Sequence, residues 1–558
     1  MGTAGPGGRR VVVVGGGISG LAAAALLAAD GYDVELLEQQ SHVGGRAGLW
    51  EADGFRFDTG PSWYLMPEVF DHFFRLMGTS AAEQLDLVQL DPAYRVFFEG
   101  HDEPLDVLPS TAANVATFER VEPGAGARLE AYLESAREAY DMALKRFLYT
   151  SYPSLVGLAT RDVVVRAPRL VQLLTRSLES FVARRFDDVR LRQVLGYPAV
   201  FLGSAPERTP SMYHLMSALD LTGGVMYPQG GFTHLIDVIA RLATERGVRI
   251  RTGATVTAIT TQPQDATRSA EGLSADGGQA DARAVRRRGA GVRLGLRRSP
   301  AARATGVRWR DADGTEHEQP ADVVVAAADL HHVETRLLPE ELRTYPQAYW
   351  DRATSGPGAV LVLLGVRGEL PALPHHSLFF TTDWRANFDA IFAGQVPVPA
   401  SAYVCKPSAT DPSVAPEGDE NLFVLVPMPA DPGLGRGGRD GAGDPAVEAV
   451  ADAAIAQIAD WAGVPDLAER VVVRRTIGPG DFAADLSAWR GGMLGPGHTR
   501  RQSAMFRARN VSRRVDGLYY AGSSTIPGIG LPMCLISSEL VLKHLRGDTS
   551  SDPVAAPL

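Results

Sequence analysis

Cysteine is scarce in this sequence of 558 residues, in which only Cys405 and Cys534 occur. Neither cysteine lies in a CxxC pattern or in another spacing typical of metal ligands. The sequence therefore predicts neither a disulfide framework nor a structural zinc site, and this cysteine usage fits a reducing, cytoplasmic setting.

An excess of positive charge is also absent, because 65 acidic residues against 55 lysines and arginines give a formal net charge of −10. This balance argues against general binding to nucleic acid, whose phosphate backbone attracts net positive charge. Hydrophobic residues make up 45% and charged residues 22% of the chain, as in ordinary globular proteins. The length predicts two domains or one large interleaved unit.

Long apolar runs are missing as well, with one exception near the start. Only the uncharged run from Val11 to Ala29 approaches the roughly 20 apolar residues that a membrane-spanning helix needs. Hydropathy alone would fit a signal peptide or a membrane span here. Four glycines interrupt the run, however, and Asp30 and Asp33 follow it directly, so the pattern favours a cytoplasmic strand, turn and helix.

The same run contains a Gly-x-Gly-x-x-Gly motif. Its surroundings predict a βαβ unit, with a strand at 11–14, a helix at 21–29 and a second strand at 34–38. In such a unit Gly15 permits a tight turn, Gly17 lets the backbone approach a pyrophosphate, and Gly20 lets the helix pack closely on the strand. The helix N-terminus then supplies free N–H groups for the phosphates.

An acid and a second glycine turn follow this motif. Glu38 ends the second strand, where a carboxylate can accept hydrogen bonds from both ribose hydroxyls of an adenosine. Gly44-Gly45-Arg46 comes soon after it and can contact the same pyrophosphate. Glycine triplets also arise by chance in a chain with 59 glycines, but here strand, helix and acid are all in place. The combination predicts dinucleotide binding and favours FAD over NAD.

A third glycine-rich segment lies near the other end of the sequence. Residues 517–522 predict a turn, a strand and a turn, and the run Pro-Gly-Ile-Gly-Leu-Pro-Met at 527–533 precedes a predicted helix at 535–545. A glycine-rich turn that opens a helix directs N–H groups toward an electron-rich group, which in a flavin is the pyrimidine edge. The pattern also fits a plain loop and a packing helix. Paired with the N-terminal motif, it predicts one binding fold closed by both ends of the chain.

The sequence between about residue 80 and residue 222 is rich in predicted amphipathic helices. An apolar stripe within residues 155–186 fits either a helix at a membrane interface or a helix that faces the protein core. Its members recur at helical spacing beside several arginines and are Leu170, Leu173, Leu174, Leu178 and Phe181.

Further along the chain, residues 233–246 predict a helix and residues 248–259 predict a strand. The Gly-, Ala-, Ser- and Arg-rich residues 261–302 predict a disordered insertion, with contact between its arginines and anionic lipid as the alternative. The tail after Gly547 also predicts disorder.

Together these elements resemble the bacterial-type phytoene desaturases, or phytoene dehydrogenases, of the carotenoid and retinoid oxidoreductase family. The resemblance covers nearly the whole chain, and its most specific part is Ser524–Met533, because a Pro-Gly-x-Gly-x-Pro box is characteristic of carotenoid desaturases. It also includes both N-terminal glycine motifs, Tyr227-Pro-Gln-Gly-Gly231, His375-His376, Pro407–Pro412 and Val414–Pro416.

The resemblance implies an α/β protein with a glutathione-reductase-like FAD-binding Rossmann fold and an interleaved helix-rich substrate domain. It places residues 1–80, 225–330 and 471–558 in a discontinuous FAD-binding domain. Residues 81–224 and 331–470 form the substrate-binding domain. The insertion at 261–302 departs from the family pattern.

The resemblance also implies a set of FAD contacts. The two N-terminal glycine motifs and Glu38 match the phosphate and ribose contacts, and Asp58-Thr-Gly-Pro61 resembles the stretch beside the flavin ring. Val256 matches a residue whose backbone reaches the adenine, and the C-terminal glycine box matches the turn over the flavin. The predicted cofactor-binding residues are Gly15, Gly17, Ile18, Ser19, Gly20, Glu38, Gly44, Gly45, Arg46, Gly60, Pro61, Val256, Gly522, Gly530, Leu531, Pro532 and Met533.

The implied activity is the conversion of phytoene to lycopene by successive dehydrogenation. Oxidised FAD accepts a hydride from a –CH2–CH2– unit beside a conjugated system, and the resulting allylic cation then loses a proton. A weak base is enough for that step, and the sequence does not identify one. His375 and His376 are candidates by residue type, although paired histidines are more often structural. No metal is predicted.

The implied substrate is a long apolar polyene, held in a tunnel walled by the helix-rich middle of the chain. Because such molecules dissolve in membranes, we expect a cytoplasmic protein in peripheral contact with the inner face of the cell membrane. Oxygen and a membrane quinone are both open as the electron acceptor.

Five other assignments share parts of this pattern. Another carotenoid desaturase, a carotenoid isomerase or a retinol-type saturase would differ in tunnel shape, which the sequence does not reveal. An amine oxidase shares the fold but needs an aromatic cage at the flavin, and the glycine-proline box at 527–532 argues against it. A prenyl-binding escort protein uses the fold without a flavin, whereas both glycine motifs and Glu38 are intact here.

Overall fold

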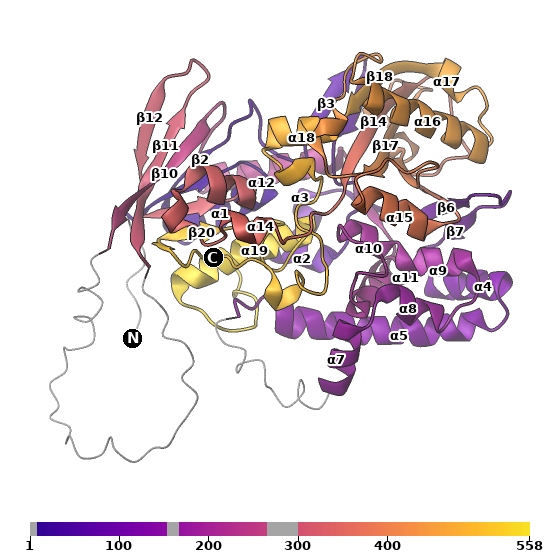
Figure 1. Cartoon of the computed structure of the whole chain (residues 1–558), viewed down its shortest axis with the longest axis horizontal. Helices are drawn as coiled ribbons and strands as arrows, with labels where there is room; N and C mark the ends of the chain where they lie inside the picture. Colours follow the sequence, from indigo (N-terminus) through magenta and orange to yellow (C-terminus); the bar gives the residue numbers. More distant parts are fainter. Residues whose placement is uncertain (1–7, 153–166, 265–299) are drawn as a thin grey trace.

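The computed structural model of the chain describes residues 8–152, 167–264 and 300–558. Most of the predicted insertion at 261–302 and the first part of the predicted apolar stripe, residues 155–166, lie outside the described residues. Within the described part the chain forms two halves, each built on its own β-sheet (Figure 1).

A five-stranded parallel sheet forms the core of the first half. All its neighbouring strands run parallel, and the valines of its central strand are buried on both faces. Its strands Arg10–Val14 and Asp33–Leu37 are parallel neighbours, which confirms the predicted βαβ unit. The sheet takes strands from both ends of the chain. Its order is β20 (Leu518–Tyr520), β13 (Val323–Ala326), β1 (Arg10–Val14), β2 (Asp33–Leu37) and β9 (Arg249–Arg251).

Helices cover one face of this sheet and a smaller sheet covers the other. The helices are α1 (Ile18–Ala29), α12 (Gly231–Glu245) and α19 (Leu531–Arg546), which share one hydrophobic core with β1. The covering sheet consists of β10 (Thr255–Pro263), β11 (Ala302–Arg310), β12 (Glu316–Pro320) and β19 (Val515–Asp516). Its apolar side chains pack against the opposite face of the parallel sheet.

The prediction of a single strand at 248–259 is wrong. Gly253 has a φ of +65° and turns the chain between β9 and β10. As a result, β9 pairs with β2 in the parallel sheet and β10 pairs with β11 in the covering sheet.

A seven-stranded mixed sheet forms the core of the second half. One of its faces packs against the long helix α16 (Pro445–Trp461), which lies along the sheet at the upper right of Figure 1. Its order is β18 (Val471–Ile477), β14 (Gly358–Val366), β17 (Glu420–Met428), β16 (Ala402–Cys405), β15 (His376–Phe380), β6 (Tyr94–Phe98) and β7 (Leu105–Val107).

A group of helices lies below this sheet and confirms the predicted helix-rich middle (Figure 1). Its members are α4 (Thr111–Val121), α5 (Ala125–Ala143), α7 (Ala167–Thr175), α8 (Leu178–Ala183), α9 (Val189–Gly196), α10 (Pro198–Phe201) and α11 (Ser217–Gly223). Among the described stripe residues, Leu173, Leu178 and Phe181 are buried in one core cluster. The stripe therefore faces the core here, and it is divided between α7 and α8.

Shorter helices and strands complete the two halves and the connections between them. They are β3 (Leu49–Ala52), β4 (Phe55–Asp58), α2 (Pro67–Leu76), α3 (Ala81–Gln84), β5 (Leu87–Gln89), β8 (Met226–Pro228), α13 (Leu330–His332), α14 (Gln347–Trp350), α15 (Trp384–Phe392), α17 (Leu467–Arg470) and α18 (Pro479–Leu486). In the part of the chain that the structure describes, no helix is both long and apolar enough to cross a membrane.

The predicted disorder after Gly547 is wrong. The buried ammonium of Lys543 donates to the carbonyl oxygens of Ser550 at 2.9 Å and Asp552 at 2.6 Å. Val554 is buried, and its N–H donates to Glu539 Oε1 at 2.6 Å. These contacts hold the tail against α19.

The predicted division into two domains stays a prediction, and the sheet pairing bears on one of its boundaries. β18 pairs with β14 in the seven-stranded sheet, although the predicted boundary at 471 assigns it to the FAD-binding domain. We propose that this boundary lies after Ile477 instead.

Candidate functional site

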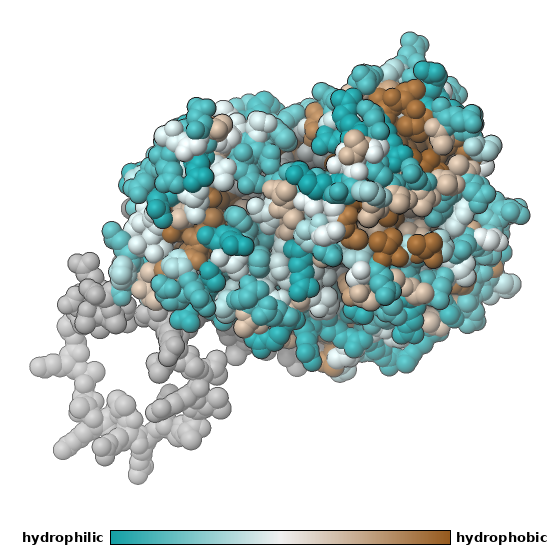
Figure 2. Space-filling model, turned by 45° about the horizontal axis from the view of Figure 1, so that its top comes forward, coloured by the Kyte–Doolittle hydropathy of each residue, from teal (hydrophilic) through white to brown (hydrophobic). Residues whose placement is uncertain are grey.

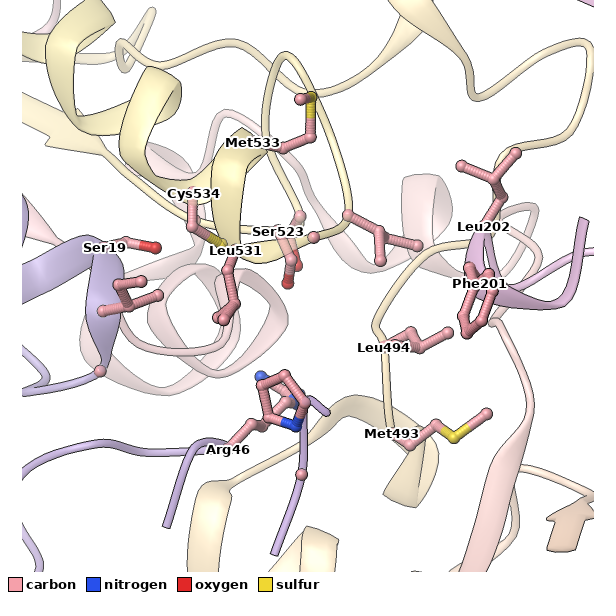
Figure 3. Close-up of a pocket in the computed structure, with 18 of the residues that line it drawn as sticks. Ser19, Arg46, Phe201, Leu202, Met493, Leu494, Ser523, Leu531, Met533 and Cys534 are labelled. Carbon is pink, nitrogen blue, oxygen red and sulfur yellow. The ribbon is translucent and has the colours of Figure 1, made fainter. Parts of the chain in front are cut away.

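A cavity of about 560 Å³ lies between the two halves, a size typical of cofactor and small-molecule sites. It is lined on one side by the predicted cofactor residues and on the other by apolar side chains of the second half. In Figure 3, Ser19, Arg46, Leu531 and Cys534 lie on the first side, across from Phe201, Leu202, Met493 and Leu494.

The structure brings together all the predicted cofactor-binding residues at this cavity, with the exception of Gly20. Gly20 packs beneath the turn, where a Cβ atom would stand 1.9 Å from the carbonyl oxygen of Gly15. Its predicted role in close helix–strand packing is therefore visible in the geometry.

The two N-terminal glycine turns lie against each other. The N–H of Gly44 donates to the carbonyl oxygen of Gly16 at 2.9 Å, and Gly17 and Gly44 form a bridge. Gly44 and Gly45 have φ angles of +124° and +59°, in the left-handed region that favours glycine. This packing leaves the first turn of α1 facing the cavity, with N–H groups that no helix carbonyl can satisfy.

The carboxylate of Glu38 is held in a fixed orientation at one end of the cavity. Its Oε2 accepts a hydrogen bond from Gly16 N–H at 2.5 Å, and its Oε1 accepts one from Gln40 N–H at 2.8 Å. The carbonyl oxygen of Glu38 accepts the N–H of Ala254 at 2.8 Å, which places Val256 nearby on β10. An acidic acceptor and a stretch of backbone thus lie together, as the predicted adenosine site requires.

Two arginines at or near the cavity, the partly buried Arg46 and the buried Arg507, lack a carboxylate partner among the described residues. Nε and one Nη of Arg46 are buried without any hydrogen-bond partner. Arg507 instead donates to four carbonyl oxygens, those of Pro496, Gln502, Ser523 and Thr525. Burial lowers the pKa of Arg507 to about 10, so it is still charged at neutral pH. The two cations favour an anionic ligand in the cavity.

In the predicted flavin-side stretch at 58–61, Asp58 has a structural role and Gly60 lines the cavity. Asp58 does not line the cavity; its carboxylate accepts the N–H groups of Phe232 at 2.6 Å and Thr233 at 3.2 Å and so caps α12. Burial raises the pKa of Asp58. Gly60 lines the cavity, where a Cβ atom would stand 1.9 Å from the carbonyl oxygen of Arg46.

The C-terminal glycine box opens a helix onto the same cavity. Gly522 and Gly530 have φ angles of +122° and +117°, and α19 begins directly after Gly530. Ser538 Oγ on α19 donates to the carbonyl oxygen of Ser19 on α1 at 2.7 Å. The N-termini of α1 and α19 therefore meet at the cavity, and both present the positive end of a helix dipole.

The other half of the cavity is apolar and rich in aromatic rings. Trp63 stands at its centre, with ring centroids between 4.7 and 6.2 Å from those of Tyr94, Tyr197, Phe201, His376 and Tyr403. Aliphatic lining residues from several elements include Leu65, Leu219, Leu361, Leu378, Ile391 and Leu425.

A buried carboxylate lies directly behind this aromatic group, and the sequence analysis missed it. Asp220 Oδ2 accepts hydrogen bonds from Tyr197 OH at 2.6 Å and Tyr94 OH at 2.9 Å. Burial raises the pKa of Asp220 to about 6. Because Tyr197 lines the cavity, the carboxylate is one side chain away from any molecule bound there.

The candidate bases proposed from residue type do not line the cavity. His375 and His376 are buried behind Trp63 and Tyr403. His498, which the sequence analysis did not single out, does line it; its Nε2 accepts Ile529 N–H at 3.3 Å and its Nδ1 lies 2.5 Å from Tyr213 OH. Burial lowers the pKa of His498, so this imidazole is neutral.

These features fit FAD. The two buried, unpaired guanidinium nitrogens of Arg46, two helix N-termini and a glycine-lined cradle suit an anionic diphosphate, and the oriented carboxylate of Glu38 suits a ribose. At Gly17, which lines the cavity, a Cβ atom would meet no protein atom closer than the carbonyl oxygen of Gly44 at 3.9 Å, so the backbone there is open to a ligand.

Comparison with known proteins finds relatives among flavoproteins and carotenoid desaturases. Residues 18–285 match the family of flavin-containing amine oxidoreductases. The chain is 40% identical to a carotenoid 3,4-desaturase from Haloarcula japonica, over 97% of this chain and 99% of the other. It is 35% identical to a zeta-carotene-forming phytoene desaturase from Myxococcus xanthus, over 96% and 94%. The fold matches that of an oxidoreductase from Methanosarcina mazei with a TM-score of 0.56, at 15% identity over 96% and 100%.

Replacing Arg46 should lower the affinity for FAD but raise the stability of the FAD-free protein. We expect Arg46→Met to weaken FAD binding by about 10- to 100-fold, because a charge-assisted contact to the cofactor is lost. The same variant should raise the melting temperature of the FAD-free protein, because two buried guanidinium nitrogens without hydrogen-bond partners are removed. Quenching of flavin fluorescence measures the first effect and thermal unfolding the second.

Arg241→Met is the control, since Arg241 lies on α12 with a half-exposed side chain. It should leave FAD affinity unchanged. A loss of stability in the FAD-free Arg46→Met protein would show that the guanidinium has a partner and is structural.

Proposed function

We propose that this chain, which belongs to the carotenoid desaturases among the flavin-containing amine oxidoreductases, converts phytoene to lycopene by successive dehydrogenation. It is an FAD-dependent oxidoreductase that acts on CH–CH bonds, and its relatives are desaturases of carotenoids. The observation that carries the proposal is the single cavity, which joins the dinucleotide cradle to an apolar, aromatic half. That half suits a hydrocarbon, because aliphatic and aromatic side chains make up most of its walls and the hydroxyls of Ser62 and Tyr403 pair with each other.

A second candidate reaction is desaturation at the 3,4 position of a carotenoid that is already conjugated. The identity of 40% to the carotenoid 3,4-desaturase, against 35% to the phytoene desaturase, favours it. The two reactions use the same chemistry and differ in the carbon pair that lies beside the cofactor.

The cofactor roles follow from the geometry of the cradle. We assign the adenosine to Glu38 and the backbone near Val256, and the diphosphate to the N-terminus of α1 with the turn at 44–46. The flavin would then be held by Gly60, Pro61, Gly522 and residues 530–533. Bound FAD supplies the acceptor for a hydride from the saturated carbon pair.

The polyene half of the cavity is suited to a developing positive charge. Hydride removal leaves an allylic cation, and the faces of aromatic rings attract cations. Asp220 adds a negative charge behind Tyr197, in a buried place where charge interactions are strong. We propose that Asp220 acts through Tyr197 to stabilise the cation, while the closed walls keep water away from it.

Peripheral membrane contact stays a proposal, and the structure suggests a different surface for it. The cavity reaches α15, of which Trp384, Phe388 and Ile391 line it. In the loop after α15 the side chain of Val398 is 90% exposed. Apolar patches interrupt the hydrophilic surface in Figure 2. We propose that the α15 loop dips into the bilayer and admits the substrate.

The substrate is tested by supplying phytoene or lycopene in liposomes to the FAD-loaded protein and identifying the extracted pigments. We expect loss of phytoene and growth of the three-banded absorption of lycopene. A protein that leaves phytoene unchanged but desaturates lycopene would replace the first proposal with 3,4-desaturation. Turnover of neither, with one FAD bound per chain, would leave only the flavoprotein assignment standing.

The membrane surface is tested by liposome flotation of Val398→Asp. A charge in the loop after α15 should reduce the bound fraction several-fold, because inserting an aspartate into the bilayer is costly. Val472→Asp, at an exposed site on β18 with 43% exposure, is the matched control and should float like the wild type. Equal flotation of both variants would exclude this loop as the contact.

Removal of the charge of Asp220 gives a pH-dependent prediction. Burial raises its pKa to about 6, so the carboxyl loses its charge as the pH falls through that value. We expect wild-type kcat to decline below pH 6, and Asp220→Asn to be slower by about 10- to 100-fold at neutral pH, without that decline. The measurement is a pH profile of kcat from pH 5 to 8.

Asp220→Glu keeps the charge and should recover part of the rate and the acidic limb. A normal profile in Asp220→Asn, with a lower melting temperature only, would mean that the carboxylate serves the fold and not the reaction.

A further inference from the structure

We propose that His375, His376 and Cys405 form a buried site for a zinc ion, separate from the cofactor cavity. None of the three residues lines that cavity. Each offers one ligand atom, and these atoms all lie within 4.8 Å of one another. The proposal does not depend on the carotenoid substrate.

The strand pairing brings the three side chains together. β15 and β16 are antiparallel, and His376 lies directly opposite Cys405 in the register. Directly opposite residues in such a pair point to the same face of the sheet. His375 precedes β15, and its ring centroid lies 4.6 Å from that of His376. The spacing of 29 positions between His376 and Cys405 explains why sequence motifs gave no metal signal.

Both imidazoles are arranged in the way that metal-binding histidines are. His375 Nδ1 lies 2.7 Å from Thr410 Oγ1, and His376 Nδ1 lies 2.8 Å from Tyr403 OH. A histidine that ligates a metal through one ring nitrogen usually donates the other N–H to such a partner. With both Nδ1 atoms engaged in this way, the Nε2 lone pairs are the ones left for a ligand.

Those Nε2 atoms are the second independent observation. Both are buried and have no hydrogen-bond partner in the structure. A buried polar atom without a partner is costly, and here two such atoms belong to histidines that each bring a ring nitrogen to within 4.8 Å of a buried thiol. A metal ion placed between them would satisfy both.

The chemistry of the ligand set selects the ion. Two neutral imidazole nitrogens and one thiolate suit zinc, whereas magnesium and calcium prefer oxygen ligands. Cys405 is a free, buried thiol, so zinc binding replaces its proton and releases one H⁺ per ion. The ion would cross-link β15 to β16, and β16 carries Tyr403, whose ring lines the cavity.

The first test is the metal content of the wild-type holoenzyme. After expression with added zinc and dialysis against metal-free buffer, we expect about one zinc per chain by mass spectrometry. Cobalt added to chelator-treated protein should give the intense near-ultraviolet band of a thiolate–Co²⁺ bond. Less than roughly a tenth of an equivalent of zinc, together with no such band, would overturn the proposal.

Variants separate this site from adventitious binding. Cys405→Ala and His376→Phe should lose the zinc, and the phenyl ring of the second variant keeps the stacking on Trp63. Cys534→Ser removes the other buried cysteine and should retain it. Equal zinc in Cys405→Ala and wild type would contradict the site. If either variant fails to fold, the wild-type zinc content and cobalt spectrum still decide.

Discussion

The close contact between α1 and the end of β1 determines the geometry of everything around the cavity. A Cβ atom at Gly20 would stand 1.9 Å from the carbonyl oxygen of Gly15, so the helix can begin where it does only with glycine there. Ser538 then ties α19 to the backbone of Ser19. The absence of a side chain at Gly20 thus sets the positions of both helix N-termini, and with them the position of the C-terminal glycine box.

Positively charged groups lie at one end of the cavity and a negatively charged group lies at the other. Arg46 and Arg507 lie near the helix N-termini without carboxylate partners among the described residues, and Asp220 lies behind the aromatic rings. Burying these groups opposes folding. In the proposed reaction the hydride moves toward the positive end and leaves a cation near the negative end. The arrangement therefore makes chemical sense for charge separation between a flavin and a polyene.

Local sequence patterns predicted the cofactor half well because its determinants are local. A glycine turn, a strand and a helix follow one another within 30 residues, and the residues of both glycine motifs meet at the cavity as predicted, apart from Gly20 below it. The strand at 248–259 was predicted as one because its apolar residues continue across Gly253, whose φ of +65° is a property of the fold. The C-terminal tail looked disordered by composition, yet Lys543 binds its carbonyl oxygens.

The substrate half was harder to predict because its key contacts join distant parts of the chain. Asp220 pairs with Tyr94 across 126 positions, and Asp58 caps a helix that begins more than 170 positions later. The stretch around Asp58 indicated a place beside the flavin and not a helix cap, and Asp220 has no distinctive neighbourhood in the sequence. The same is true of His498, which is one of 12 histidines and gains its place only when its loop meets Ile529.

The guanidinium of Arg507 has a consequence for how this sequence can diverge. Its planar group of donors binds four carbonyl oxygens, those of Pro496, Gln502, Ser523 and Thr525. Lysine offers three donors from a single nitrogen and cannot reproduce that geometry. Evolutionary drift or laboratory redesign is thus free to alter the side chains of these loops, whereas the arginine that joins their backbones is a fixed point on which any altered substrate pocket must be built.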